Sequence, residues 1–224
     1  MFFLYIYKTF TNQIIRTLIR LKMNYLAHLF LSGNNDLLKI GNFMADGIRG
    51  NDYLNFPEEV KNGIILHRHI DTFTDAHPMY RKSKHRLHEK YGHYAGVIMD
   101  ILYDHFLAKN WSHYCDEKLE DYAANFYKSL EDNYNILTEK TQHLLPYMTQ
   151  RNWLVNYATI AGIEMILFQM DYRTKHRANM QEAVVELQEF YVEFEEEFTL
   201  FFEELSAFCK AENGSFINQN ILKT

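Results

Sequence analysis

The longest regular pattern of hydrophobic and polar positions lies near the C-terminus, between residues 178 and 208. Apolar side chains recur there three and four positions apart, which predicts one long helix with an a/d-type apolar face. That face consists of Val184, Leu187, Tyr191, Phe194, Phe198, Phe201, Leu205 and Phe208. The solvent-exposed side is expected to carry the acidic residues of the segment, including Glu193, Glu195, Glu196 and Glu197. The residues after Lys210 are expected to form a frayed tail.

Helical patterns also cover most of the preceding chain. A short apolar helix is expected at 24–31, and Ser32 and Gly33 end it; another begins at Pro57 and ends before Pro78. Further helices are expected at 79–90, 94–107, 117–130, 138–147 and 151–170. Only three prolines and nine glycines interrupt the 224 residues, which favours helices over an architecture with many turns. The predicted fold class is all-α, in a single compact multi-helix domain.

Composition and charge narrow the class of protein. A hydrophobic content of 47%, with 16% aromatic residues, argues for a folded chain with a sizeable core. The net charge of −6 argues against broad nucleic-acid binding, which usually needs a basic domain. No stretch reaches the roughly 18 consecutive apolar residues that a membrane span requires. Cys115 and Cys209 lie in no metal-ligand spacing, so a reducing, cytoplasmic compartment is the default expectation.

The first 22 residues differ from the rest of the chain. They carry four basic residues and no acidic one, and their apolar run precedes the charges, which is the reverse of a secretory signal. We expect translation to start at Met23, so that 1–22 is a mis-assigned extension, 23–210 the helical domain and 211–224 the tail. An amphipathic surface helix at 12–21 is the alternative interpretation.

The expected helix at 94–107 is apolar on nearly every side, yet it contains Asp100, Asp104 and His105. Burying a carboxylate without a partner lowers the stability of the fold by roughly several kcal/mol, so these groups must be paired, protonated or bound to a metal. Asp100 and Asp104 share one helix face, and His105 lies about 100° from Asp104. The segment therefore predicts either part of a functional site or a structural ion network in the core.

A second cluster of ionisable residues lies at 67–75. His67, Asp71 and Asp75 are spaced i, i+4, i+8, so they stay near one face of a helix. Imidazole and carboxylate are ligand types that suit divalent metals. His69 points about 200° away from His67, which makes His67 with Asp71 the better chelating pair. The alternative is a solvated helix face or a local cluster of ion pairs.

Two further candidates come earlier in the chain. Asp46 is flanked by Ala45 and Gly47, with Arg49 nearby, and is interpreted either as a helix-terminal cap or as a carboxylate exposed in a cleft. His28 lies within the apolar segment 24–31. A histidine in such surroundings is more often a hydrogen-bonded core residue than a ligand, so His28 is only a secondary candidate.

The helix expected at 79–90 is strongly basic, in a chain that is otherwise acidic. The bland interpretation is a solvated helix face, and the functional one is a docking surface for an acidic partner. The basic residues concerned are Arg81, Lys82, Lys84, Arg86 and Lys90.

Four of these segments resemble, in the same order, motifs of the acyl carrier protein phosphodiesterase family. The resemblance runs from Met23 to about Cys209, and the motifs are Asn24-Tyr25-Leu26-Ala27-His28-Leu29, Gly41-Asn42-Phe43-Met44-Ala45-Asp46-Gly47-Ile48-Arg49-Gly50, His67-Arg68-His69-Ile70-Asp71 with Thr74-Asp75, and Asp104-His105-Phe106-Leu107. It implies hydrolysis of the phosphodiester that joins 4′-phosphopantetheine to a serine of holo-acyl carrier protein, with a divalent cation, commonly Mn²⁺. It also implies distant kinship with the all-helical HD-type metal phosphohydrolases.

Two departures accompany the resemblance. The family's third residue in the His-Arg-Arg-Ile-Asp motif is replaced here by His69, and the nearest approach to an HD dipeptide is the reversed Asp104-His105. The metal ligands that we expect are Asp46, His67, Asp71 and Asp104. Asp46 is also counted among the catalytic residues, with His105 or His69 as general acid and Arg68 or Arg49 facing the phosphoryl charge. Secondary candidates are His28, Arg49, Asp75 and Asp100.

Three other interpretations stay open. The chain could be a metal-dependent phosphohydrolase of another substrate, such as a nucleotide. It could be a non-catalytic helical module that binds an acidic partner. In the purely structural interpretation, the ionisable residues at 100–105 form a core network, and metal would not raise the melting temperature.

Overall fold

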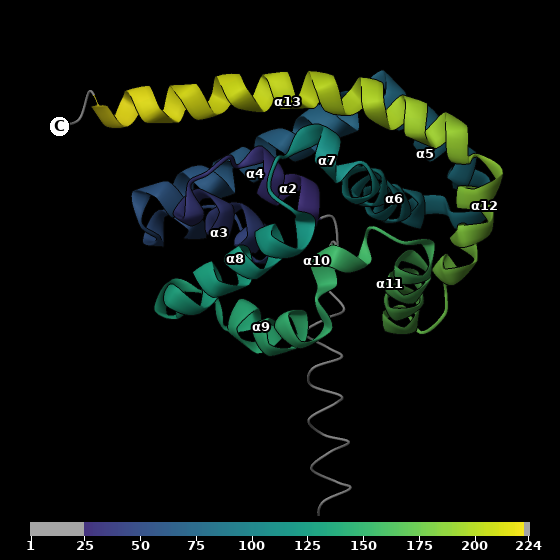
Figure 1. Cartoon of the computed structure of the whole chain (residues 1–224), viewed down its shortest axis with the longest axis horizontal. Helices are drawn as coiled ribbons and strands as arrows, with labels where there is room; N and C mark the ends of the chain where they lie inside the picture. Colours follow the sequence, from purple (N-terminus) through teal and green to yellow (C-terminus); the bar gives the residue numbers. More distant parts are fainter. Residues whose placement is uncertain (1–24, 222–224) are drawn as a thin grey trace, which may run out of the picture.

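The computed structural model describes residues 25–221, and its elements are all helical (Figure 1). The segment 1–22 lies outside the described residues. The helices are α2 (Tyr25–Leu31), α3 (Asp36–Met44), α4 (Glu58–Ala76), α5 (Pro78–Tyr91), α6 (Ala95–Lys109), α7 (Trp111–Tyr114), α8 (Leu119–Asp132), α9 (Glu139–Arg151), α10 (Trp153–Asn156), α11 (Ile160–Arg173), α12 (Ala183–Glu189) and α13 (Tyr191–Ile221). No strand occurs within 25–221, so the all-α prediction is confirmed.

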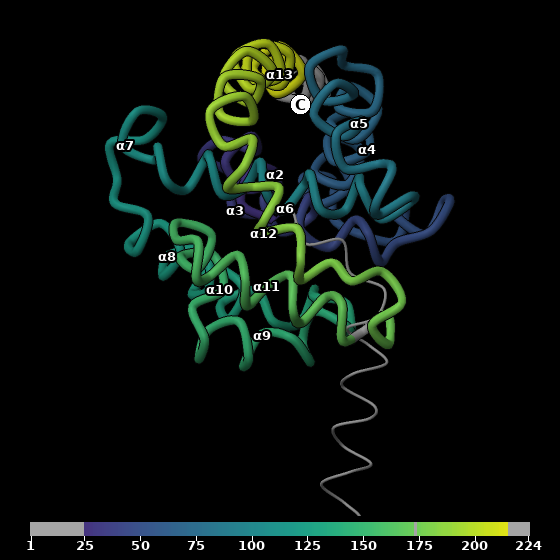
Figure 2. The backbone as a smooth tube through the Cα atoms, turned by 90° about the vertical axis from the view of Figure 1, so that its right-hand side faces the viewer, coloured from purple at the N-terminus to yellow at the C-terminus, as the bar shows by residue number. Residues whose placement is uncertain are grey.

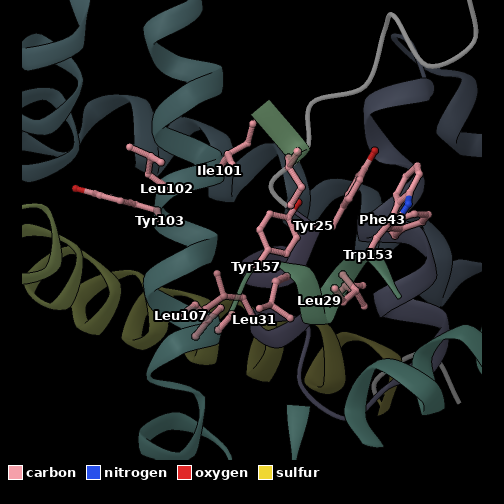
Figure 3. Close-up of a cluster of buried hydrophobic side chains, with 14 of the residues drawn as sticks. Tyr25, Leu29, Leu31, Phe43, Ile101, Leu102, Tyr103, Leu107, Trp153 and Tyr157 are labelled. Atoms are coloured by element: carbon pink, nitrogen blue, oxygen red, sulfur yellow. The ribbon is translucent and has the colours of Figure 1, made fainter. Parts of the chain in front are cut away.

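Helix α6 lies in the middle of the molecule and contacts α2, α5, α11 and α13. Every residue from Ile98 to Ala108 is buried, as its apolar composition on all sides predicted. Ile101 and Leu107 of α6 belong to the buried cluster that includes Leu29 of α2 and Tyr157, whereas Leu102 projects from the other side of the helix (Figure 3). Helix α13 runs along one edge of the fold beside α4 and α5 (Figure 2).

Two long helices predicted from the sequence are interrupted. The segment 151–170 is interrupted at two places: Asn152 has a left-handed conformation with φ of 45°, and residues 157–159 separate α10 from α11, which the side chain of Thr159 caps. The segment 178–208 is divided between a short 3₁₀ turn, α12 and α13. At the other end the helix continues to Ile221, where a frayed tail was expected. The apolar spacing was recognised correctly, but the ends of the helices depend on the backbone conformation of individual residues, such as the positive φ angles of Asn152 and Asn179.

The acidic side of α13 is not wholly exposed to solvent. Glu197 is only 4% exposed, and it accepts hydrogen bonds from both terminal nitrogens of Arg86, from Ser83 and from Lys82. These hydrogen bonds hold the pKa of the Glu197 carboxyl below its usual range against the effect of burial. Lys90 pairs in the same way with Glu186 of α12, at 2.8 Å. The prediction that Glu197 lies on a solvated face is therefore wrong.

These pairs change the interpretation of the basic helix α5. Lys82, Arg86 and Lys90 join α5 to α12 and α13, so three of the five predicted docking residues hold the fold together. Lys84 lies over the ring of Tyr80. Arg81 is exposed, and its Nε donates to the backbone carbonyl of Asp75 at the end of α4.

Helices α3 and α4 cross with their backbones in direct contact, at Gly41 and Gly63. A Cβ atom on Gly63 would lie 2.2 Å from the carbonyl oxygen of Leu38, and one on Gly41 would lie 2.1 Å from that of Val60. Only glycine fits such an approach. The crossing brings the end of α3 against the face of α4 that carries His67.

Candidate metal centre

Two histidines and two aspartates from three separate segments meet beside this crossing. His28 of α2, His67 of α4 and Asp71 of α4 place one ligand atom each within 4.8 Å of one another. His28 Nε2 lies 3.6 Å from Asp71 Oδ1, and His67 Nε2 lies 3.5 Å from Asp71 Oδ2. Asp46, from the 3₁₀ turn Ala45–Gly47, adds a carboxylate oxygen 3.4 Å from His67 Nε2.

Burial keeps His28 of this cluster neutral. The rings of His28 and His67 stack with centroids 4.2 Å apart, and their side chains are only 3% and 7% exposed. Burial lowers the pKa of His28 to about 3; the neighbouring His67 acts in the same direction, whereas Asp71 and Asp46 act to raise this pKa. The carboxylates of Asp46 and Asp71 are more exposed, so the cluster opens toward solvent on their side.

The residues present fit a divalent cation. His67 Nε2 is buried and has no hydrogen-bond partner among the described residues, although carboxylate oxygens of Asp46 and Asp71 lie 3.4 and 3.5 Å away. A buried imidazole nitrogen facing two carboxylates is satisfied by a metal ion between them. Two nitrogen and two oxygen donors form a set that suits manganese, iron or zinc. The sequence favoured a core role for His28, whereas the structure brings it into the cluster.

Arg68 and Arg49, the two arginines predicted to face the phosphoryl charge, belong to the segments that carry His67 and Asp46. Arg68 follows His67 on α4; its guanidinium donates to the carbonyl oxygen of Gly50 at 2.9 Å and lies 5.0 Å from the ring centroid of Tyr53. These contacts fix the loop that follows Asp46. Arg49 is exposed in that loop. The structure is therefore compatible with either arginine facing a bound anion.

Asp104 lies outside the metal-ligand cluster. Its two carboxylate oxygens accept hydrogen bonds from the backbone N–H groups of Leu26 and Ala27, both at 2.9 Å, at the beginning of α2. Burial raises the pKa of Asp104 to about 8, and these hydrogen bonds act in the opposite direction. The sequence predicted Asp104 as a metal ligand. In the structure, Asp104 of α6 instead caps the N-terminus of α2 and so helps to fix the position of α2 and of His28 on it.

We expect Asp104→Ala to lower the free energy of unfolding of the metal-free protein by about 2–4 kcal/mol, because two buried N–H groups lose their acceptors. Chemical denaturation in the presence of a chelator measures this. Asp132→Ala on the exposed part of α8, which breaks only the surface pair with Lys128, is the control and should change stability by less than about 1 kcal/mol. Unchanged or increased stability of the Asp104 variant would contradict the capping role.

The other ionisable residues of α6 also have structural partners. His105 donates from Nδ1 to the carbonyl of Tyr157 at 2.8 Å, and the Tyr191 hydroxyl lies 2.9 Å from its Nε2. Asp100 accepts a hydrogen bond of 2.7 Å from the Tyr80 hydroxyl. The interpretation of 100–105 as a core network thus describes this segment better than the interpretation as part of the site. His105 is not with the cluster, which removes the reason to regard it as the general acid.

His69 and Asp75 are likewise separated from the cluster. His69 Nδ1 lies 2.5 Å from a carboxylate oxygen of Glu212, near the C-terminal end of α13, and its side chain is 45% exposed. Asn213, the next residue, donates to the carbonyl of Leu31 at 2.9 Å. The departure from the family motif at position 69 therefore coincides with a contact to the last helix. Asp75 is exposed, one turn beyond Asp71.

Sequence reasoning missed one polar residue at the centre of the site. Asn42 is fully buried on α3, and its side-chain oxygen lies 2.8 Å from His28 Nδ1 and 3.0 Å from His67 Nδ1. The only signal in the sequence was an amide within an apolar, glycine-containing segment. The three glycines at 41–50 predict a close backbone approach or a special turn, but nothing in the sequence identifies Gly63 as the counterpart of Gly41.

The fold and the site together define the chain as an all-helical protein with a buried histidine–carboxylate cluster that could hold a metal ion. A family model described as acyl carrier protein phosphodiesterase matches residues 23–205. The chain belongs to the acyl carrier protein phosphodiesterase family.

Curated relatives agree with this family. A Photorhabdus laumondii protein named acyl carrier protein phosphodiesterase is 35% identical over 156 residues, which cover 67% of this chain and 77% of the relative. Proteins of the same name from Pectobacterium atrosepticum and Escherichia coli are each 32% identical, over 67% of this chain and 79% of the relative. No solved structure matches the chain. Within the described residues, no helix combines the length and apolar character needed to cross a membrane.

Proposed function

We propose that this protein hydrolyses the phosphodiester between 4′-phosphopantetheine and the serine of holo-acyl carrier protein, releasing apo-carrier protein and 4′-phosphopantetheine. The observation that carries the proposal is the convergence of His28, His67, Asp71 and Asp46 in a chain of this family. The reaction belongs in the reducing, cytoplasmic compartment that the cysteine pattern predicts. The cation that we propose is divalent, with Mn²⁺ as the first candidate from the family resemblance.

The four side chains would hold the cation through two neutral imidazole nitrogens and two carboxylate oxygens. A bound divalent metal supplies charge that polarises a phosphoryl oxygen and lowers the pKa of water, which suits an anionic and poorly electrophilic phosphodiester. The buried histidines exclude water on one side, so substrate approaches from the side of Asp46 and Asp71. Arg68, held by Gly50 and Tyr53, supplies a fixed positive charge beside that opening.

The carrier protein must dock close to this opening, because the phosphodiester is attached directly to its serine. Two exposed arginines belong to, or are hydrogen-bonded to, the chain segments that supply the carboxylates of this opening. Arg49 comes three residues after Asp46, and Arg81 is bonded to the carbonyl of Asp75, one turn beyond Asp71. Acyl carrier proteins are acidic, so we propose that these two residues, rather than the whole basic face of α5, guide docking.

The double substitution Arg49→Glu with Arg81→Glu should raise KM for holo-carrier protein about tenfold and leave kcat within about twofold, because rim charges affect encounter more than chemistry. Steady-state kinetics at low and high salt measure this, and the difference should shrink as salt increases. Arg177→Glu, an exposed charge reversal in the turn after α11, is the matched control. Equal KM values for the double variant and the control would contradict docking at these residues.

The function itself is tested by incubating the full chain with Mn²⁺ and holo-carrier protein and recording the intact mass of the carrier. Loss of the phosphopantetheine mass, blocked by a chelator, is the expected result. Turnover of nucleotide phosphodiesters with no change of the carrier would instead favour a phosphohydrolase of another substrate. Carrier binding without turnover would favour a non-catalytic binding module.

A further inference from the structure

Asn42 is held in one orientation by hydrogen bonds on its nitrogen side. Its side-chain nitrogen donates to the backbone carbonyl of His28 at 3.0 Å and to Ser32 Oγ at 2.9 Å. The Ser32 hydroxyl in turn donates to the same carbonyl at 2.8 Å, so it accepts from Asn42. A flipped amide would place its oxygen against the carbonyl oxygen of His28. The network therefore fixes the amide oxygen, and not the nitrogen, toward the two imidazole rings.

That oxygen determines where both histidines carry their hydrogen. It lies 2.8 Å from His28 Nδ1 and 3.0 Å from His67 Nδ1, and an amide oxygen only accepts hydrogen bonds. Both Nδ1 atoms must therefore carry hydrogen. A neutral imidazole has one N–H, so both Nε2 atoms present lone pairs, and these are the atoms that face Asp71 and Asp46.

We propose that Asn42 is a positioning residue whose single carbonyl oxygen fixes the tautomer and ring orientation of both His28 and His67, so that two lone pairs converge on one cation. The inference rests on the metal centre of the proposed function and adds a residue that supports its ligands from behind. Such supporting hydrogen bonds typically change metal affinity by about 10–100-fold. One residue serving two ligands makes their orientation interdependent.

Asn42 also acts against a competing arrangement. If Nε2 carried the hydrogen, each ring could donate directly to a carboxylate, since the nitrogen–oxygen separations are 3.4–3.6 Å. That arrangement would satisfy the same atoms without a cation and would close the site. By accepting from Nδ1, Asn42 favours the tautomer in which the Nε2 atoms offer lone pairs to a cation and do not donate to the carboxylates.

The proposal is tested on the metal-free full chain by ¹⁵N NMR of the histidine rings, with Zn²⁺ affinity from calorimetry as the second readout. In the wild type, His28 and His67 should both show a protonated Nδ1 and an unprotonated Nε2. Asn42→Leu, which keeps the approximate size and removes the acceptor, should give Nε2–H for at least one ring and weaken Zn²⁺ binding about 10–100-fold. Asn42→Asp keeps an acceptor and should preserve the Nδ1–H tautomers.

Asn62→Ala removes another buried asparagine, on the neighbouring helix α4, and serves as the control for general destabilisation. It should leave the tautomers and the Zn²⁺ affinity unchanged. If Asn42→Leu does not fold, the wild-type tautomers and Ser32→Ala carry the test, because loss of the hydroxyl removes one of the two acceptors that orient the amide and should weaken Zn²⁺ binding measurably. A wild-type Nε2–H tautomer, or unchanged tautomers in folded Asn42→Leu, would overturn the proposal.

The outcome is separable from that of the proposed function. The NMR and calorimetric measurements need no carrier protein. Correct tautomers and Zn²⁺ binding in a chain that fails to cleave holo-carrier protein would reject the substrate and leave the role of Asn42 intact.

Discussion

Replacing His67 with alanine is expected to reduce hydrolysis of holo-acyl carrier protein by about three orders of magnitude. His67 Nε2 faces both Asp46 and Asp71 and is the one ring nitrogen of the cluster that is buried without a hydrogen-bond partner among residues 25–221. Removing the imidazole takes away the nitrogen ligand that lies near both carboxylates. A loss of several kcal/mol of transition-state stabilisation corresponds to an effect of roughly this size. Single-turnover kinetics with saturating Mn²⁺ would measure it.

The same substitution should abolish the rise in melting temperature on adding metal. His113→Ala on α7 is the matched control, because it removes an exposed histidine that lies outside the cluster. The control should retain both turnover and the thermal shift. A His67→Ala protein that still hydrolyses the carrier within about tenfold of wild type would rule out the cluster as the reaction centre.

Gly63→Ala is expected to cost about 3 kcal/mol of stability and to disrupt metal binding as well. The new Cβ atom would lie 2.2 Å from the Leu38 carbonyl oxygen and 2.8 Å from the backbone nitrogen of Asn42. Both are backbone atoms, so α3 and α4 must separate. The movement shifts Asn42 away from His67. For a chain of this size the melting temperature should fall by about 6–12 °C.

Gly96→Ala is the control for this experiment, because it lies within a helix and its new Cβ would meet only side-chain atoms at ordinary contact distances of 3.7 Å or more. It should be neutral or stabilise by up to about 1 kcal/mol. Calorimetry, with and without Zn²⁺, compares the two variants. A Gly63→Ala protein with unchanged melting temperature and unchanged Zn²⁺ affinity would show that the crossing tolerates a side chain.

The helical fold could be predicted because its signals are local. Apolar spacing along α13, the proline that precedes α4 and the sparse glycines all act within one or two turns. The two wrong helices failed where one residue decides the backbone, as Asn152 does with its left-handed conformation. Burial of Glu197 depended on α5, more than a hundred residues away in the chain. A pattern within one segment contains no information on such a partner.

In the candidate site too, residues with local signals could be predicted and residues with distant partners could not. His67 and Asp71 were recognisable as a pair because one helical turn separates them, and Asp46 because small residues flank it. Asp104 and His105 were correctly recognised as buried ionisable groups, but the metal and the backbone amides were equally good partners for them on the sequence alone. The structure supplies the amides for Asp104 and a backbone carbonyl for His105.

The contacts near the end of α13 connect the helices of the candidate metal centre to a part of the chain beyond the family match. The family match ends at residue 205, whereas His69 and Leu31 are held by Glu212 and Asn213. His69 lies on α4 and Leu31 on α2, the helices that carry His67 and His28. Positions 69 and 212 should thus change together over evolutionary time, and a lineage that lost the last turns would need another way to brace the two histidine-bearing helices.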